Sequence, residues 1–291
     1  MKKRIYCDYN ATTPVIPAVK KAYINALDVY GNASSLHETG RMAKEALENS
    51  RMAVAAFINA LPEQLLFCSS GTEANNQVLQ QLIAQQRDEG PVHVLVSAIE
   101  HSSVLETAKI LESWGIEVEC IPVTAEGLVE VDTLVSLLKP HTKLVSVMFA
   151  NNEIGSIQDI AALSRVVKDH GALFHCDAVQ ALGKVVIDVA QLDVDFMTFS
   201  AHKIGAPKGV SRLIQRVGRS NHRIDQPSRA ILVPTNRFEY LECLAAKLEI
   251  ESGSMDGANF RVGGLDVLAQ HLLCKEVYKA GYTNILGSQT L

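Results

Sequence analysis

A single lysine, Lys203, follows an apolar, β-prone run at 196–199, at the point where the sequence changes to small and polar residues. If that run is a strand of an open α/β sheet, Lys203 stands at its carboxyl end, where such sheets bind their ligands. A lysine whose pKa is lowered by burial or nearby charge can form a Schiff base with a carbonyl compound. A lone lysine is more often a surface residue in a loop, so the rest of the sequence must decide between these interpretations.

Four other polar stretches follow apolar runs in the same way. Residues 69–73 open a candidate helix, whose N-terminal N–H groups and dipole can hold a phosphate. The remaining stretches are 100–101, 151–153 and 175–177, the last with Gln180 three residues further on. Each has a structural explanation by itself, as a helix cap, a turn or a core histidine. Together they would bring to one edge of a sheet the groups that an anionic, heteroaromatic cofactor needs.

Pyridoxal phosphate is a cofactor with these requirements: a lysine for covalent attachment, an acid at its ring nitrogen and a cup for its phosphate. Lys203 and Asp177 suit the first two, and His101 could stack on the ring and move protons, which makes Lys203 and His101 the candidate catalytic residues. We expect Gln180 to bond the ring oxygen, and Asn152 the ring oxygen or the substrate. The candidate cofactor-binding residues are Gly71, Thr72, His101, Asn152, Asp177, Gln180, Ser200, His202 and Lys203.

The elements that must position these residues alternate along the chain. Apolar runs predict strands at 64–68, 92–97, 117–121, 143–149, 172–176 and 195–199, and amphipathic stretches predict helices at 40–57, 72–87, 102–114, 131–139 and 159–170. The alternation predicts an α/β fold with a mostly parallel sheet and helices on both faces. In the first helix, Ala43, Leu47, Val54 and Phe57 recur at helical spacing, which predicts one buried face.

Composition bounds the class of protein. The chain has 291 residues, of which 47% are hydrophobic and 20% charged, and its net charge is −5, which fits a globular protein of about two domains. The sequence contains no apolar stretch of signal-peptide or membrane-spanning length, so we expect a cytoplasmic protein with no membrane contact. The six cysteines are far apart without a C-x-x-C pair, which favours buried free thiols over disulfides or a zinc site.

The sequence motifs around these residues resemble the cysteine desulfurase group of the class V aminotransferases. They are IYCDYNATTP, GNASSLHETGR, SSGTEANN, IEHSSVL, NNEIGSIQDI, HCDAVQALGK and FSAHKIGAPKG, which occur in the family's order between residues 5 and 209. The resemblance covers residues 5–203 and implies the fold of type I pyridoxal-phosphate enzymes and a homodimer. It also implies removal of sulfur from L-cysteine to give alanine and an enzyme persulfide, a sulfur-acceptor or scaffold protein, and a place in iron–sulfur cluster assembly.

One part of the family pattern is missing. The family carries its sulfur-accepting thiolate on a loop well beyond the lysine, whereas Cys243 and Cys274, the cysteines that follow Lys203, lie in helix-like sequence. The run 251–254 is followed by Met255, where the family's pattern would lead to the cysteine. A reactive thiol needs exposure and a positive environment. We therefore expect weak or no desulfurase activity from this chain alone.

The tail has a different character. Between residues 204 and 237 it has seven lysines and arginines against one acid, Asp225, a pattern typical of a solvated face or of an anion or nucleic-acid contact. The segment QRVGRSNHR resembles the last motif of large Lhr-type DNA helicases, although the chain has no G-x-x-x-x-G-K-[ST]. We predict a desulfurase-like domain at 1–203 and a helicase-like fragment at 204–291. The alternative functions are nucleic-acid binding through Arg212, Arg216, Arg219 and Arg223, and a fusion product that binds pyridoxal phosphate without catalysis.

Overall fold

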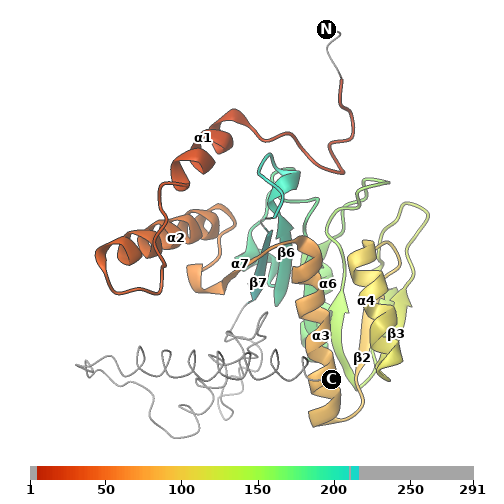
Figure 1. Ribbon diagram of the computed structural model, residues 1–291. Coiled ribbons are helices and arrows are strands. Elements are labelled where there is room, and N and C mark those ends of the chain that lie inside the picture. The colour runs from red at the N-terminus through yellow and green to blue at the C-terminus, as the bar shows by residue number, and fades with distance from the viewer. Residues whose placement is uncertain (1–4, 210, 216–291) are drawn as a thin grey trace, which may run out of the picture. The chain divides into compact units, whose positions relative to one another are not determined.

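The computed structural model describes residues 5–209 and 211–215, which contain one seven-stranded sheet (Figure 1). Its order is β1-β7-β6-β5-β4-β2-β3, and β7 runs antiparallel to both of its neighbours while the other adjacent pairs are parallel. The predicted mostly parallel α/β sheet is confirmed. The strands are β1 (Leu65–Cys68), β2 (His93–Ser97), β3 (Glu117–Ile121), β4 (Thr142–Ser146), β5 (Leu173–Asp177), β6 (Phe196–Ser200) and β7 (Ser211–Gln215).

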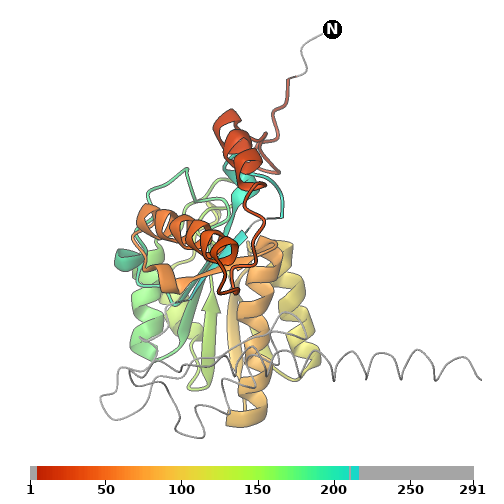
Figure 2. The ribbon, with the colours of Figure 1, turned by 60° about the vertical axis from the view of Figure 1, so that its left-hand side comes forward.

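Helices cover both faces of the sheet. Successive residues of β2 face opposite ways: Val94 and Val96 belong to a core cluster with α3 and α4, while Leu95 packs in the cluster that includes α5 and α6. Figure 2 shows α6 on one side of the strands and α3 with α4 on the other. The helices are α1 (Pro17–Ala26), α2 (Glu38–Phe57), α3 (Gly71–Glu89), α4 (Ser102–Ser113), α5 (Val131–Leu137), α6 (Ile160–His170) and α7 (Val189–Leu192), with 3₁₀ turns η1 (Pro62–Gln64) and η2 (Ala201–Lys203).

Side-chain caps fix where the helices near the sheet edge begin. The hydroxyl of Ser70 accepts the N–H of Glu73 at 3.0 Å at the start of α3, and Asp159 caps α6 through the N–H of Ala162 at 3.1 Å. At the other end of α6, Gly171 takes the left-handed conformation, with φ +91°, that ends many helices. These local signals explain why the expected boundaries of the two helices differ from the observed ones by only one or two residues.

Helix α2 differs from the expectation of one buried apolar face. Its buried residues are Gly40, Ala43 and Ala55, whereas Leu47 is 40% and Phe57 64% exposed. The spacing correctly predicted a helix. Small residues are its fully buried ones and Val54 packs partly buried against the core, but Leu47 and Phe57 face outward. The apolar surface of α2 is therefore available for a further contact.

Beyond Lys203, the described structure includes the antiparallel strand β7, which the apolar pattern did not reveal. Most of the predicted 204–291 fragment, with Cys243 and Cys274, lies outside the described residues, so the domain boundary stays a prediction. The described cysteines are free thiols as expected, but only Cys176 is buried, while Cys7 and Cys120 are exposed. No helix within the described ranges is long and apolar enough to cross a membrane.

Candidate active site

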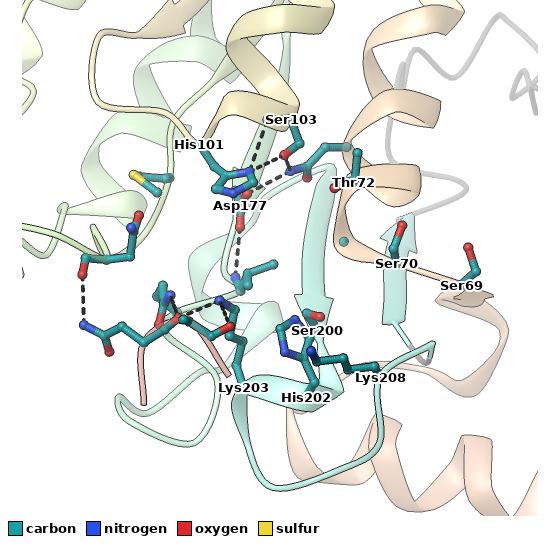
Figure 3. A pocket seen from close by; sticks show the side chains of 18 of the residues that line it. Ser69, Ser70, Thr72, His101, Ser103, Asp177, Ser200, His202, Lys203 and Lys208 are labelled. Carbon is teal, nitrogen blue, oxygen red and sulfur yellow. Dashed lines mark hydrogen bonds between the residues drawn. The ribbon is translucent and has the colours of Figure 1, made fainter. Parts of the chain in front are cut away.

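A cavity of about 650 Å³ opens at the carboxyl ends of the parallel strands, and all the predicted site residues line it (Figure 3). Because β1 and β6 both run antiparallel to β7, the end of β1 lies at the same edge as the end of β6. The turn after β1, which opens α3, therefore meets the turn after β6, which holds the lysine. The lining residues that were predicted are Gly71, Thr72, His101, Asn152, Asp177, Gln180, Ser200, His202 and Lys203.

Lys203 is the last residue of η2, directly beyond the buried strand β6. Its Nζ donates to the carbonyl oxygens of Asn10 at 2.6 Å and Ala11 at 3.0 Å. Burial lowers the pKa of Lys203, and the positive charge of Lys184 lowers it further, while the acids Asp177 and Asp8 oppose both effects. A lower pKa increases the fraction of neutral amine, which is the nucleophilic form.

Asp177 ends β5 and is 3% exposed. Its Oδ1 accepts the backbone N–H of Val179 at 2.9 Å, and its Oδ2 accepts the side-chain amide of Asn75 at 2.8 Å. Burial raises the pKa of Asp177, while these two hydrogen bonds and then the nearby His101 and Lys203 lower it. The arrangement supplies a carboxylate that can pair with a positively charged ring nitrogen inside the cavity.

The N-terminus of α3 supplies the anion-binding end of the cavity. Ser70 caps the helix, so the N–H groups of Gly71 and Thr72, in the first turn, have no partner within the helix. A side chain at residue 71 would bring a Cβ within 3.2 Å of Val179 Cγ2, so glycine allows the close packing at this turn. The hydroxyl-bearing Ser200 and the ring of His202 line the same cavity.

His101 caps α4 from the neighbouring turn. Its Nδ1 accepts the backbone N–H of Ser103 at 3.1 Å and lies 2.8 Å from the Ser103 hydroxyl oxygen. His101 therefore both caps α4 and lines the cavity. The ring can face a bound heteroaromatic group while its Nδ1 stays attached to the helix.

Gln180 and Asn152 are each hydrogen-bonded to Asn10 of the amino-terminal segment. Gln180 donates from Nε2 to the carbonyl oxygen of Asn10 at 2.9 Å, and Asn10 donates from its side chain to the carbonyl oxygen of Asn152 at 2.9 Å. Lys184 donates to Gln180 Oε1 at 2.6 Å and to Asn10 Oδ1 at 3.2 Å. Asn10 thus contacts Lys184 and three residues that line the cavity, Asn152, Gln180 and Lys203, which sequence spacing alone could not reveal because it stands far from all of them in the chain.

Two further groups beside the site were not predicted. Glu100 is buried, its Oε1 accepts the Ser97 hydroxyl at 2.7 Å, and burial with the nearby Asp177 raises its pKa to about 8. Lys208 lines the cavity on the side of His202, and its charge contributes to lowering the pKa of His202, after burial and Lys203. The raised pKa of Glu100 favours its neutral form near pH 7, whereas Lys208 adds positive charge near the anion-binding turn.

Comparison with known proteins identifies the family. A model of the family "Aminotransferase class-V" matches residues 5–242. The chain belongs to the class V aminotransferases. It is 44% identical over 218 residues to the cysteine desulfurase IscS of Methylococcus capsulatus, covering 74% of this chain and 54% of the relative. It is 40% identical over 223 residues to IscS of Dictyoglomus turgidum, covering 76% and 56%. The chain thus spans about half the length of these curated relatives.

Solved structures of two related proteins show the same fold. A NifS-like protein superposes with a TM-score of 0.73 at 35% identity, covering 81% of this chain and 64% of that one. The structure of SspA in complex with cysteine gives a TM-score of 0.70 at 32% identity, covering 72% and 61%. The predicted resemblance to cysteine desulfurases over residues 5–203 is confirmed, while the helicase-like tail is not addressed by these matches.

The class V aminotransferases and the cysteine desulfurases among them depend on pyridoxal 5'-phosphate, and the cavity of this chain fits that group. Its requirements are an amine, a buried acid and an anion-binding turn in one space. Lys203, Asp177 and the first turn of α3 meet these requirements in the described structure. The predicted cofactor is therefore confirmed, and the assignment of each residue to a part of it is argued below.

Proposed function

We propose that this chain binds pyridoxal phosphate and acts on L-cysteine in the manner of a cysteine desulfurase, removing the sulfur and leaving alanine. The observation that carries the proposal is that Lys203, Asp177 and Thr72 line one cavity although they lie at or just beyond the ends of three different strands. The 44% identity to a cysteine desulfurase and the likeness to a structure solved with cysteine support the choice of substrate.

Each residue has a distinct task in this proposal. The neutral amine of Lys203 attaches the cofactor covalently, and burial with the charge of Lys184 favours that neutral form. Asp177 faces the ring nitrogen and keeps it protonated, because an ionised carboxylate stabilises the adjacent positive charge. When bound, pyridoxal phosphate supplies an electron sink that lets bonds at the substrate's α and β carbons break. His101 stacks on the ring and moves protons at the substrate.

The other residues bind and orient the cofactor. The free N–H groups at the start of α3, the hydroxyls of Thr72 and Ser200 and the ring of His202 bind the phosphate. Gln180 bonds the ring oxygen through the second proton of Nε2, because its bond to the Asn10 carbonyl uses only one of the two. Asn152, which also lines the cavity, bonds the ring oxygen or the substrate.

We propose that sulfur transfer is the impaired part of the reaction. Among the described thiols, Cys176 lies in β5, and burial followed by the charges of Asp177 and Glu100 raises its pKa well above the usual value. Such a thiol is a poor nucleophile. Cys243 and Cys274 lie outside the described residues. The expected result is cofactor binding with weak release of sulfur, whose acceptor would be a separate protein of iron–sulfur cluster assembly.

The visible spectrum tests the first half of the proposal. Purified protein mixed with pyridoxal phosphate should gain the absorption that the cofactor shows when a lysine amine binds it, and Lys203→Ala should abolish it. Lys184→Arg serves as a matched control because it alters a lysine that contacts the cavity-lining residues Asn10 and Gln180 but keeps the charge. A spectrum that Lys203→Ala leaves unchanged would refute the assignment of Lys203.

Sulfide release from L-cysteine, measured with and without a reductant, tests the second half. Turnover at the rate of a full-length desulfurase would contradict the proposed impairment while leaving the cofactor site intact. The alternative of nucleic-acid binding depends on arginines outside the described side chains and gains no support from the family match. The predicted homodimer and cytoplasmic location stay predictions, and sedimentation of the cofactor-loaded protein measures the former.

A further inference from the structure

Asn75 is a buried polar residue of α3 whose role the sequence did not suggest. It lies in the second turn of the helix, is 1% exposed and lines the cavity. Its Nδ2 donates to Asp177 Oδ2 at 2.8 Å and to Ser103 Oγ at 2.9 Å. A side-chain amide nitrogen has two protons, so both are committed, one to each partner.

The orientation of this amide follows from its partners. The reversed orientation would place Oδ1 against the carboxylate of Asp177, where two acceptors repel. In the observed orientation, Oδ1 is buried without a hydrogen-bond partner among the described residues, which is itself unfavourable. In the folded protein, both N–H groups of the Asn75 side chain are therefore hydrogen-bonded, while its oxygen has no hydrogen-bond partner among the described residues.

Ser103 extends the contact to His101. Because its hydroxyl oxygen accepts from Asn75, the hydroxyl proton is available for His101 Nδ1, 2.8 Å away. The backbone N–H of Ser103 points to the same ring nitrogen at 3.1 Å. Two donors facing Nδ1 require a lone pair there, so the neutral ring carries its proton on Nε2.

We propose that Asn75 is a positioning residue that couples the Asp177 carboxylate to the His101 ring through Ser103. Figure 3 shows the connected side chains, with Asp177 and His101 beside one another at the wall of the cavity. The inference rests on the roles proposed above for Asp177 and His101. Asn75 holds the acid that faces the ring nitrogen and, through one hydroxyl, the imidazole that faces the ring, without donating a hydrogen bond to His101 itself.

The first test uses the protein without cofactor. Asn75→Leu removes a hydrogen bond that lowers the pKa of Asp177, so the titration midpoint of the Asp177 carboxyl carbon, followed by ¹³C NMR, should move to higher pH. The matched control is Asn76→Leu, the same change one residue along α3, where the amide oxygen accepts from Thr107. An Asp177 midpoint that is the same in both variants would overturn the role of Asn75. If Asn75→Leu does not fold, Asn75→Ala makes the same test with less bulk.

The second test asks whether the coupling reaches His101. The ¹⁵N signal of Nδ1 should shift toward that of a more weakly hydrogen-bonded nitrogen in Ser103→Ala, which keeps only the backbone N–H as a donor, and should shift in the same direction in Asn75→Leu. It should stay unchanged in Ser102→Ala, which alters the exposed neighbouring serine of α4. A shift in Ser103→Ala without any in Asn75→Leu would show that Ser103 serves His101 alone, and the proposed coupling would be wrong.

Cofactor affinity separates this inference from the proposed function. The dissociation constant of pyridoxal phosphate should rise roughly tenfold in Asn75→Leu, and its dependence on pH should move upward with the Asp177 midpoint. If Asn75 were needed only for packing, its replacement would weaken cofactor binding without shifting the pH dependence of that binding. Failure of the wild-type protein to bind the cofactor would defeat the proposed function, whereas binding that Asn75→Leu leaves unaltered in both affinity and pH dependence would defeat this inference alone.

Discussion

The amine of Lys203 donates to the carbonyl oxygen of Asn10 at 2.6 Å, although 193 positions separate the two residues in the chain. The contact is one of several between the amino-terminal segment and the turn after β6. Thr13 donates from its backbone N–H and its hydroxyl to the carbonyl oxygen of His202, at 2.9 and 2.7 Å. The segment that precedes α1 is therefore part of the cavity wall, and the amine must leave it in order to react.

Removing the side chain of Asn10 should loosen this wall. Asn10→Ala loses the bonds to the Asn152 carbonyl and to Lys184, so we expect pyridoxal phosphate to bind about three- to tenfold more weakly. Hydrogen exchange of residues 8–13 should become faster in the same variant. Asn25→Ala, an exposed change in α1 away from the cavity lining, is the control. Equal exchange in the two variants would show that the Asn10 side chain does not fasten the segment.

Lys184 should set the pH at which Lys203 reacts. Its positive charge is the second cause, after burial, of the lowered pKa of Lys203, so Lys184→Met should raise that pKa. Less neutral amine is then present at a given pH, and the rate of covalent attachment of pyridoxal phosphate should reach its midpoint at higher pH. Stopped-flow absorbance against pH measures this shift. Lys184→Arg preserves the charge and should preserve the midpoint. If Lys184→Met and Lys184→Arg give the same pH profile, the charge of Lys184 does not set the pKa of Lys203.

Local signals in the sequence predicted most of the sheet and brought together nine residues that line one cavity, because apolar runs and the polar residues that end them are close in the chain. They could not predict Asn10 or Asn75, whose roles come from side-chain contacts made across the fold. The antiparallel strand β7 was missed because its place depends on pairing with β1 and β6. The outward side of α2 was misjudged because helical spacing shows where apolar residues gather but not whether a partner covers them.

Glu100 should make stability fall with rising pH. Burial, then the nearby Asp177, raises its pKa from 4.5 to about 8, so the folded protein keeps a proton that the unfolded chain releases. The stabilisation is complete below about pH 4.5 and is lost as the pH rises through about 8, on the order of a few kcal/mol. Glu100→Gln stays neutral, so its free energy of unfolding should lack this decline. Urea unfolding from pH 5 to 9 measures it.

Glu100→Ala provides the contrast for that experiment. It removes the acceptor of the Ser97 hydroxyl and of the Met148 N–H, so it should lower the free energy of unfolding by about 1–3 kcal/mol even at pH 5. The glutamine retains an oxygen for these donors and should cost much less. Parallel pH profiles for the wild type and Glu100→Gln would mean that Glu100 is ionised in the folded protein.

The anion-binding end of the cavity can be tested with two ligands that differ only in the phosphate. Thr72→Val and Ser200→Ala each remove one hydroxyl near the start of α3, so each should weaken pyridoxal phosphate about tenfold, as expected for a hydrogen bond to a charged group. Pyridoxal, which has no phosphate, should bind the wild type and both variants with equal affinity. Fluorescence titration measures both ligands. If the variants lose as much affinity for pyridoxal as for pyridoxal phosphate, the two hydroxyls contact another part of the cofactor. The N-terminus of α3 is then only a capped helix end and not a phosphate site.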